Sequence, residues 1–151
     1  MTLDPREFPR HILLVEDNDD DVMLAQRALA ERGATQVTAV TRAAQALDYL
    51  YRRGEYADRA EDDPALVVLD LSLPDGSGLD VLRQLQNDPR MRHIPVVVLT
   101  VSEKDADRSE SYAAGASVFL QKPVQYQDFV ATMRAIGRFW RDLQFGEEEG
   151  S

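Results

Sequence analysis

Short runs of apolar residues alternate along the chain with longer segments in which apolar residues recur every three or four positions. The most regular run, Leu66-Val67-Val68-Leu69, is followed at once by Asp70 and by a turn that contains Pro74 and Gly76. A continuous run rich in Val and Leu is typical of a strand buried on both faces, as in a parallel sheet. Ligands of open α/β sheets bind at the carboxyl ends of such strands. Asp70 therefore lies where chemistry can take place, although an isolated aspartate there more often caps a loop amide.

The same alternation predicts five strands and five helices. The predicted strands are 11–15, 36–40, 66–70, 94–100 and 117–121, and the second, which alternates in polarity, is expected at a sheet edge. The predicted helices begin at Asp19 or Asp20, at Thr41, after Gly78, at Ser102 or Asp105, and near Gln125. They end at Gly33, at Gly54, before Pro89, before Gly115 and near Leu143. Residues 55–64 are polar and are expected to form an exposed loop.

Strands that alternate with helices imply right-handed crossovers and a parallel sheet with helices on both faces. We therefore expect one α/β domain over residues 11–143, with a long last helix. A polar lead-in over residues 1–10 precedes this domain, and an acidic solvated tail over 144–151 follows it. Neither a repeat nor a second domain is predicted.

Composition narrows the classes of function. The chain has 151 residues, 44% of them hydrophobic and 29% charged, as in a folded globular domain. Its net charge of −10 argues against a nucleic acid or an anionic membrane as partner. The absence of cysteine excludes disulfides, a thiolate nucleophile and a zinc–thiolate site. The polar start does not resemble a signal peptide and no apolar run reaches 18 residues, so we expect a cytoplasmic protein.

Polar residues follow the predicted central strands at the points where these strands end. They are Glu16, Asp17, Asp70, Thr100 and Lys122. Each has an ordinary structural explanation, as a helix cap, a loop cap or a surface ammonium group. The carboxyl ends of parallel strands share one edge of the sheet, however, so all five residues are expected to converge. Such coincidences at four strand ends along one edge are far less probable than one, and we interpret the set as a site.

The chemistry of this set favours phosphoryl transfer. Clustered carboxylates repel one another unless a cation lies between them, and carboxylate, carbonyl and water ligands suit Mg²⁺. Lys122 and Thr100 suit phosphate oxygens, and the carboxylate of Asp70 can act as a nucleophile that forms an aspartyl phosphate. A glycine-rich phosphate-binding loop is absent from the sequence, so ATP is not expected to be the direct donor.

Four motifs resemble those of the response-regulator receiver domain of two-component signalling, over residues 11 to about 141. They are Leu14-Val15-Glu16-Asp17-Asn18, Val68 to Gly76 with Asp70 in third place, Val97-Val98-Leu99-Thr100 and Gln121-Lys122-Pro123. The resemblance implies a flavodoxin-like (βα)5 fold with strand order 2-1-3-4-5. Further features resemble receivers paired with phytochrome-like histidine kinases. These features are the acidic run 17–21, the polar insertion 55–64, Asp88-Pro89-Arg90 with His93-Ile94-Pro95, and Phe139-Trp140.

The resemblance also implies how the site binds its phosphoryl group and its metal ion. Asp70 would accept the phosphoryl group from the phosphohistidine of a sensor histidine kinase, and a bacteriophytochrome is the candidate kinase. Mg²⁺, or Mn²⁺ in its place, would be held by Asp70, by Asp17 directly and by Glu16 through a water molecule. The backbone carbonyl of Ser72 would be a further ligand.

Other residues would respond to the phosphoryl group. Lys122 would contact it, ahead of a cis peptide bond to Pro123. Thr100 would turn inward to bond the phosphate, and Phe119 would follow as the aromatic switch. Two positions depart from the commonest family pattern, Val101, where a small residue is frequent, and Ser72, where Asn or Met is frequent. The bulk of Val101 bears on access to the phosphate, and a side-chain role of Ser72 in dephosphorylation is left open.

The surface that would bind a downstream partner is predicted less directly than the phosphoryl and metal site. No output domain is predicted in this sequence, so we expect output to pass through a surface of the fourth helix, the fifth strand and the last helix. The apolar stripe Phe129, Met133, Ile136, Trp140 and Leu143 is assigned mainly to the core, with Phe139 off the stripe and Val130 beside it. One hypothesis is a homodimer through the last helix and the fifth strand, and the alternative is scattered surface apolar residues.

Our interpretation is a signalling protein with self-catalysed phosphoryl transfer and slow autodephosphorylation, not an enzyme that turns over a substrate. Three alternatives stay open. A phosphorelay intermediate would use the same residues. A Mg²⁺-dependent phosphohydrolase would carry Asp-x-Asp at the nucleophile, but Ser72 stands in the second place, and no cap domain is predicted. A receiver that no longer accepts phosphate is disfavoured because Glu16, Asp17, Asp70, Thr100 and Lys122 are all present.

Overall fold

A computed structural model describes residues 11–30, 36–60, 62–101 and 105–149, without the side chains of residue 77, residues 105–108 and residues 139–149. The strands are β1 (His11–Val15), β2 (Gln36–Val40), β3 (Leu66–Asp70), β4 (Ser72–Leu73), β5 (Gly76–Ser77), β6 (Val96–Thr100) and β7 (Val118–Gln121). The helices are α1 (Asp19–Leu29), α2 (Ala43–Tyr51), α3 (Gly78–Asn87), α4 (Asp105–Ala113) and α5 (Tyr126–Glu149), with a 3-10 turn η2 (Gly54–Tyr56).

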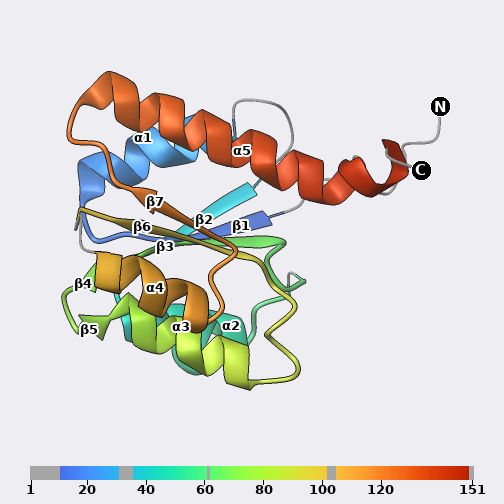
Figure 1. Ribbon diagram of the computed structural model, residues 1–151. Helices are drawn as coiled ribbons and strands as arrows, with labels where there is room; N and C mark the ends of the chain where they lie inside the picture. The colour runs from blue at the N-terminus through green and yellow to red at the C-terminus, as the bar shows by residue number, and fades with distance from the viewer. Residues whose placement is uncertain (1–10, 31–35, 61, 102–104, 150–151) are drawn as a thin grey trace.

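Five parallel strands form one sheet in the order β2-β1-β3-β6-β7. Counted along the chain without the two short strands, this is the predicted order 2-1-3-4-5, and the predicted flavodoxin-like α/β fold is confirmed. Figure 1 shows α1 and α5 on one face of the sheet and α2, α3 and α4 on the other. The strands β4 and β5, which the sequence did not predict, pair antiparallel in the loop after Asp70.

Two apolar layers explain why the central strands are continuously apolar. Leu13, Val67 and Leu69 belong to the layer under α2 and α3, whereas Leu14 and Val68 belong to the layer under α1 and α5. All residues of β1, β3 and β6 are buried, because helices cover both faces of the sheet. No helix in the described part of the chain is long and apolar enough to cross a lipid bilayer.

The caps of α1 and α2 differ from those predicted. The N-cap of α1 is Asn18, whose side chain accepts a hydrogen bond from the amide of Asp21 at 3.0 Å, and not Asp19 or Asp20. Thr41 does not cap α2. Its amide and hydroxyl both donate to the side chain of Gln45.

The free amides at the start of α2 are bonded by a residue from a distant loop. The carboxylate of Asp75 accepts hydrogen bonds from the amides of Ala43 at 2.7 Å and Ala44 at 3.0 Å. This side chain comes from the β4–β5 turn, more than 30 positions along the chain. A capping residue that is remote in sequence leaves no local signal before the helix.

The helix ends also differ in part from the predicted ones. α2 ends at Tyr51, where Arg52 adopts a left-handed conformation with φ of 54°, and Gly54 instead begins η2. Gly33, the predicted end of α1, lies outside the described residues, and the helix ends at Leu29. α5 continues to Glu149, well beyond Leu143, so helical backbone covers most of the segment predicted as a tail. The side chains of Phe139, Trp140 and Leu143 are not among those described.

The segment 55–64 is not the fully exposed loop that its polarity predicted. The side chain of Arg59 is only 2% exposed, and its guanidinium carbon lies 4.3 Å from the centre of the Tyr49 ring. The same guanidinium group donates to the carbonyl oxygens of Tyr49 and Asp62. The long charged side chain thus anchors the insertion to α2, which sequence polarity alone does not reveal.

Candidate functional site

The parallel register brings the ends of four strands to one edge of the sheet. Val15 at the end of β1 aligns with Leu69 of β3, and Asp70 aligns with Leu99 of β6. Thr100 in turn aligns with Gln121 of β7, so that Lys122 follows directly at the same edge. The predicted convergence of strand ends therefore exists in the fold.

Three carboxylates at this edge form a compact cluster. Glu16, Asp17 and Asp70 each offer one oxygen, and these oxygens all lie within 4.8 Å of one another. Glu16 and Asp70 are buried, with 2% and 5% of their surfaces exposed, while Asp17 is exposed to solvent. Three carboxylates with one open side are a donor set that fits a hard divalent cation.

Lys122 places its ammonium group among the carboxylates. Its Nζ atom lies 2.5 Å from Oε1 of Glu16, 3.1 Å from Oδ2 of Asp70 and 3.0 Å from Oδ2 of Asp21. The side chain is only 11% exposed, so these contacts form in a largely dry environment. The Lys122–Pro123 peptide bond is trans, and the predicted cis bond is wrong: the trans form is the favoured one for this bond, and Lys122 reaches the cluster with it.

Asp21 is a contact that sequence analysis missed. It lies at the acidic start of the first helix, within residues 16–21, where five of the six positions are carboxylates. Such a run does not indicate which side chain turns inward, since that depends on where the helix begins. With Asn18 as the N-cap, the side chain of Asp21 faces Lys122.

Burial and charge shift the acid–base properties of the cluster. Burial raises the pKa of Glu16 to about 7, and the hydrogen bond from Lys122 opposes this rise while the charge of Asp70 adds to it. Burial also disfavours the charged form of Lys122. The hydrogen bonds that Lys122 donates to Glu16 and Asp21, together with the negative charges of Asp70 and Glu16, outweigh that effect, so the pKa of Lys122 lies above its usual value.

The loop after β3 fixes the orientation of the Asp70 side chain. The amide of Ser72 donates to Oδ1 of Asp70 at 2.9 Å, while Oδ2 faces Lys122. The short β4–β5 pair follows and returns the chain to Gly78, whose amide donates to the carbonyl of Leu71 at 3.0 Å. The two carboxylate oxygens of Asp70 thus have different and defined partners.

The two residues predicted to act as a switch are both buried. Thr100 is 2% exposed at the end of β6, and its carbonyl accepts a hydrogen bond from the amide of Lys122. Phe119, 7% exposed, packs in the apolar layer under α2 and α3, and its amide donates to the hydroxyl of Tyr112. Val101, next to Thr100, is 63% exposed.

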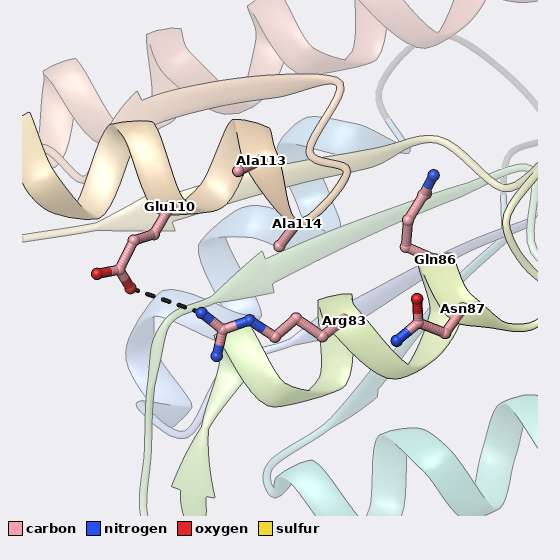
Figure 2. A pocket seen from close by; sticks show the side chains of 6 residues that line it. All are labelled: Arg83, Gln86, Asn87, Glu110, Ala113 and Ala114. Carbon is pink, nitrogen blue, oxygen red and sulfur yellow. Dashed lines mark ion pairs between the residues drawn. The ribbon is translucent and has the colours of Figure 1, made fainter.

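A cavity of about 200 Å³ lies away from the carboxylates, between α3 and α4. Figure 2 shows its lining residues, Arg83, Gln86, Asn87, Glu110, Ala113 and Ala114. Arg83 and Glu110 form an ion pair of 3.7 Å that connects the two helices. None of the clustered carboxylates lines this cavity, so it is separate from the candidate site.

A parallel α/β sheet with an acidic cluster and a lysine at its carboxyl edge defines a known class of protein. Residues 12–134 match the family model of the response regulator receiver domain, and the chain belongs to this family. It is 40% identical over 135 residues to the probable methanogenesis regulatory protein FilR2 of Methanothrix harundinacea, a match that covers 89% of this chain and 85% of that protein. It is 34% identical over 133 residues to the response regulator Rcp1 of Synechocystis, with 87% and 89% covered.

Solved structures agree with these matches. The phosphorylated cyanobacterial phytochrome response regulator RcpA superposes with a TM-score of 0.82 at 35% identity, over 87% of this chain and 94% of that one. The Mn²⁺-bound form of Rcp1 superposes with a TM-score of 0.81 at 32% identity, over 89% and 96%. The predicted resemblance to receivers of phytochrome signalling is therefore confirmed at the level of the family and of these relatives.

Proposed function

We propose that this protein accepts a phosphoryl group on Asp70 from the phosphohistidine of a sensor histidine kinase. The observation that carries the proposal is the convergence of Glu16, Asp17 and Asp70 with the ammonium group of Lys122. A buried carboxylate held by a backbone amide, with a cation beside it, is arranged for attack on an electrophilic phosphorus.

The proposed reaction is a direct displacement at phosphorus. One carboxylate oxygen of Asp70 forms a bond to phosphorus while the bond from phosphorus to the imidazole nitrogen breaks. The electron pair of that bond stays on the imidazole, which takes up a proton. Lys122 and the hydroxyl of Thr100 then bind the phosphoryl oxygens, so catalysis consists of positioning and charge stabilisation.

The acidic cluster would hold the divalent cation that this chemistry requires. We assign Asp17, Asp70 and the backbone carbonyl of Ser72 as its ligands, with Glu16 holding it through a water molecule and with Mg²⁺ as the ion. Mn²⁺ can replace it, in line with the Mn²⁺-bound form of Rcp1. When bound, the ion supplies positive charge to the phosphoryl oxygens.

The proposed donor is a histidine kinase of the phytochrome type, such as a bacteriophytochrome, because RcpA is described as a phytochrome response regulator. Phosphorylation would act through Thr100 and Phe119 on the surface formed by α4, β7 and α5. Exposed apolar side chains lie on or near this surface, namely Tyr112, Val124 and Tyr126. We propose that the surface binds a second copy of this chain or a downstream protein.

The test is intact mass spectrometry after incubation with acetyl phosphate and Mg²⁺. The wild-type protein is expected to gain the mass of one phosphoryl group, which hydroxylamine removes and which does not form in the presence of EDTA. Asp70→Asn should gain none. Asp80→Asn is the matched control, because it changes an aspartate of α3 whose side chain is 76% exposed. A full mass gain in Asp70→Asn would refute the assignment.

A further inference from the structure

Lys122 has one more carboxylate partner than the proposed phosphorylation chemistry needs. Besides Glu16 and Asp70, its Nζ atom contacts Oδ2 of Asp21 at 3.0 Å, and Asp21 lies in the first turn of α1. This contact connects α1 to the residue after β7, across more than 100 positions of sequence. Because this contact occupies Lys122, it affects whether the ammonium group can bind a phosphoryl group.

The ammonium group has three N–H donors, and three carboxylates surround it. A phosphoryl oxygen can therefore bind Lys122 only if one of the present partners is displaced. Asp70 is the proposed acceptor itself. The side chain of Glu16 is only 2% exposed, so its release from Lys122 would leave a buried carboxylate with the amide of Asn18 as hydrogen-bond donor but without its ion-pair partner. The side chain of Asp21 is 27% exposed and can be solvated when it is released. Asp21 is thus the carboxylate partner of Lys122 that is displaced most easily.

We propose that Asp21 is a positioning residue that holds Lys122 in the resting state and slows phosphorylation by competing with the phosphoryl group. This inference rests on the proposed function of Asp70. The Asp21 carboxylate competes for an N–H donor of Lys122, and its negative charge, close to the ammonium group, also repels an incoming anionic donor. Both effects oppose transfer, and the second grows with the charge of the donor.

Substitution of Asp21 removes this contact without removing the helix cap. The cap of α1 is formed by the Asn18 side chain, which bonds to the backbone amide of Asp21 and not to its carboxylate. Asp21→Asn keeps the size of the side chain and removes only its charge. Asp20→Asn is a matched control in the same turn, since Asp20 is exposed and makes no ion pair with the residues the structure describes.

The test compares phosphorylation rates with two donors of different charge. Acetyl phosphate is a dianion at neutral pH and loses acetate, whereas phosphoramidate is a monoanion and loses ammonia. In both cases the bond from phosphorus to the leaving group breaks as the bond to Asp70 forms. Asp21→Asn should react about three- to tenfold faster with acetyl phosphate, and the gain with phosphoramidate should be smaller. Asp21→Ser should show the same pattern, and Asp21→Glu should return toward the wild-type rate.

The outcomes separate this inference from the proposed function. If the wild-type protein takes up no phosphoryl group on Asp70, the proposed function fails and the inference fails with it. If the wild-type protein is phosphorylated but Asp21→Asn matches Asp20→Asn, or reacts more slowly than the wild type, the proposed function stands and the role of Asp21 is refuted. An equal gain with both donors would also contradict the role of charge.

Discussion

Gly78 illustrates, at the scale of one residue, how tightly the backbone closes around Asp70. A Cβ atom at this position would lie 2.4 Å from the carbonyl oxygen of Asp70 and 3.0 Å from the Cα atom of Leu71. Both neighbours are backbone atoms in a loop closed by the Gly78–Leu71 hydrogen bond, so they have little freedom to move away. A side chain here would displace the segment that carries the proposed phosphoacceptor.

We therefore expect Gly78→Ala to destabilise the protein by about 2 kcal/mol, as overpacking of a rigid site does, and to slow phosphorylation of Asp70. Gly137→Ala is the control. Gly137 lies inside α5, and the nearest atom outside its own helix, the carbonyl oxygen of Leu29, would be 3.8 Å from an added Cβ. The helix gains up to about 1 kcal/mol from alanine. Urea unfolding of both variants measures the change in the free energy of unfolding. A change of the same sign in both variants would contradict the prediction.

At the scale of elements, α2 depends on a loop that belongs to the site. Its N-cap, Arg42, makes no side-chain capping bond, and the carboxylate of Asp75 binds the first two amides instead. The backbone hydrogen bond from Ala44 lowers the pKa of Asp75 below its usual value of 3.8, with a further contribution from Ala43. The ionised form of Asp75 therefore stabilises the fold.

Asp75→Ala should lower the free energy of unfolding at pH 7 by about 1 kcal/mol, the usual loss when a helix cap is removed. Because the pKa is lowered in the folded state, this contribution is complete well above the unfolded-state pKa of 3.8 and is lost as the pH falls through the lowered pKa of the folded state. The difference in the free energy of unfolding between the wild type and Asp75→Ala should thus become smaller in acid. Denaturation over a pH series measures it, with Asp58→Ala, an exposed aspartate, as the control. A difference that grows in acid would contradict the capping role.

At the scale of the whole molecule, the proposed association through α5 and β7 can be tested with matched surface changes. Tyr126 at the start of α5 is 62% exposed, and Met23 on α1 is 60% exposed. If α5 and β7 form the interface, Tyr126→Lys should weaken a dimer that Met23→Lys leaves intact, because a buried lysine without a partner is unfavourable.

Sedimentation velocity over a concentration series, with and without phosphorylation, is the measurement. Equal weakening by both variants would place the interface elsewhere. A wild-type protein that stays monomeric at high micromolar concentration in both states would refute the dimer itself.

The positions of the central strands could be predicted from the sequence because they depend on burial, whereas the order of the strands was implied only by the resemblance to the receiver family. A continuous apolar run indicates a strand that helices cover on both faces, and this pattern located β1, β3 and β6. The convergence of Glu16, Asp70 and Lys122 then followed from the parallel pairing of these strands. Contacts between remote residues left no such signal. The cap by Asp75, the burial of Arg59 and the contact of Asp21 with Lys122 each depend on tertiary packing.

The position of β1 inside the sheet, between β2 and β3, has a consequence for engineering. A chain break after Ala60 would put Glu16, Asp17 and Asp21 on one fragment, and Asp70 and Lys122 on the other. The strands β1 and β3 pair across this break, with Leu14 opposite Val68, so the fragments must rebuild the middle of the sheet before the carboxylates and the lysine meet. Phosphorylation of the split protein would therefore report whether the two fragments have associated.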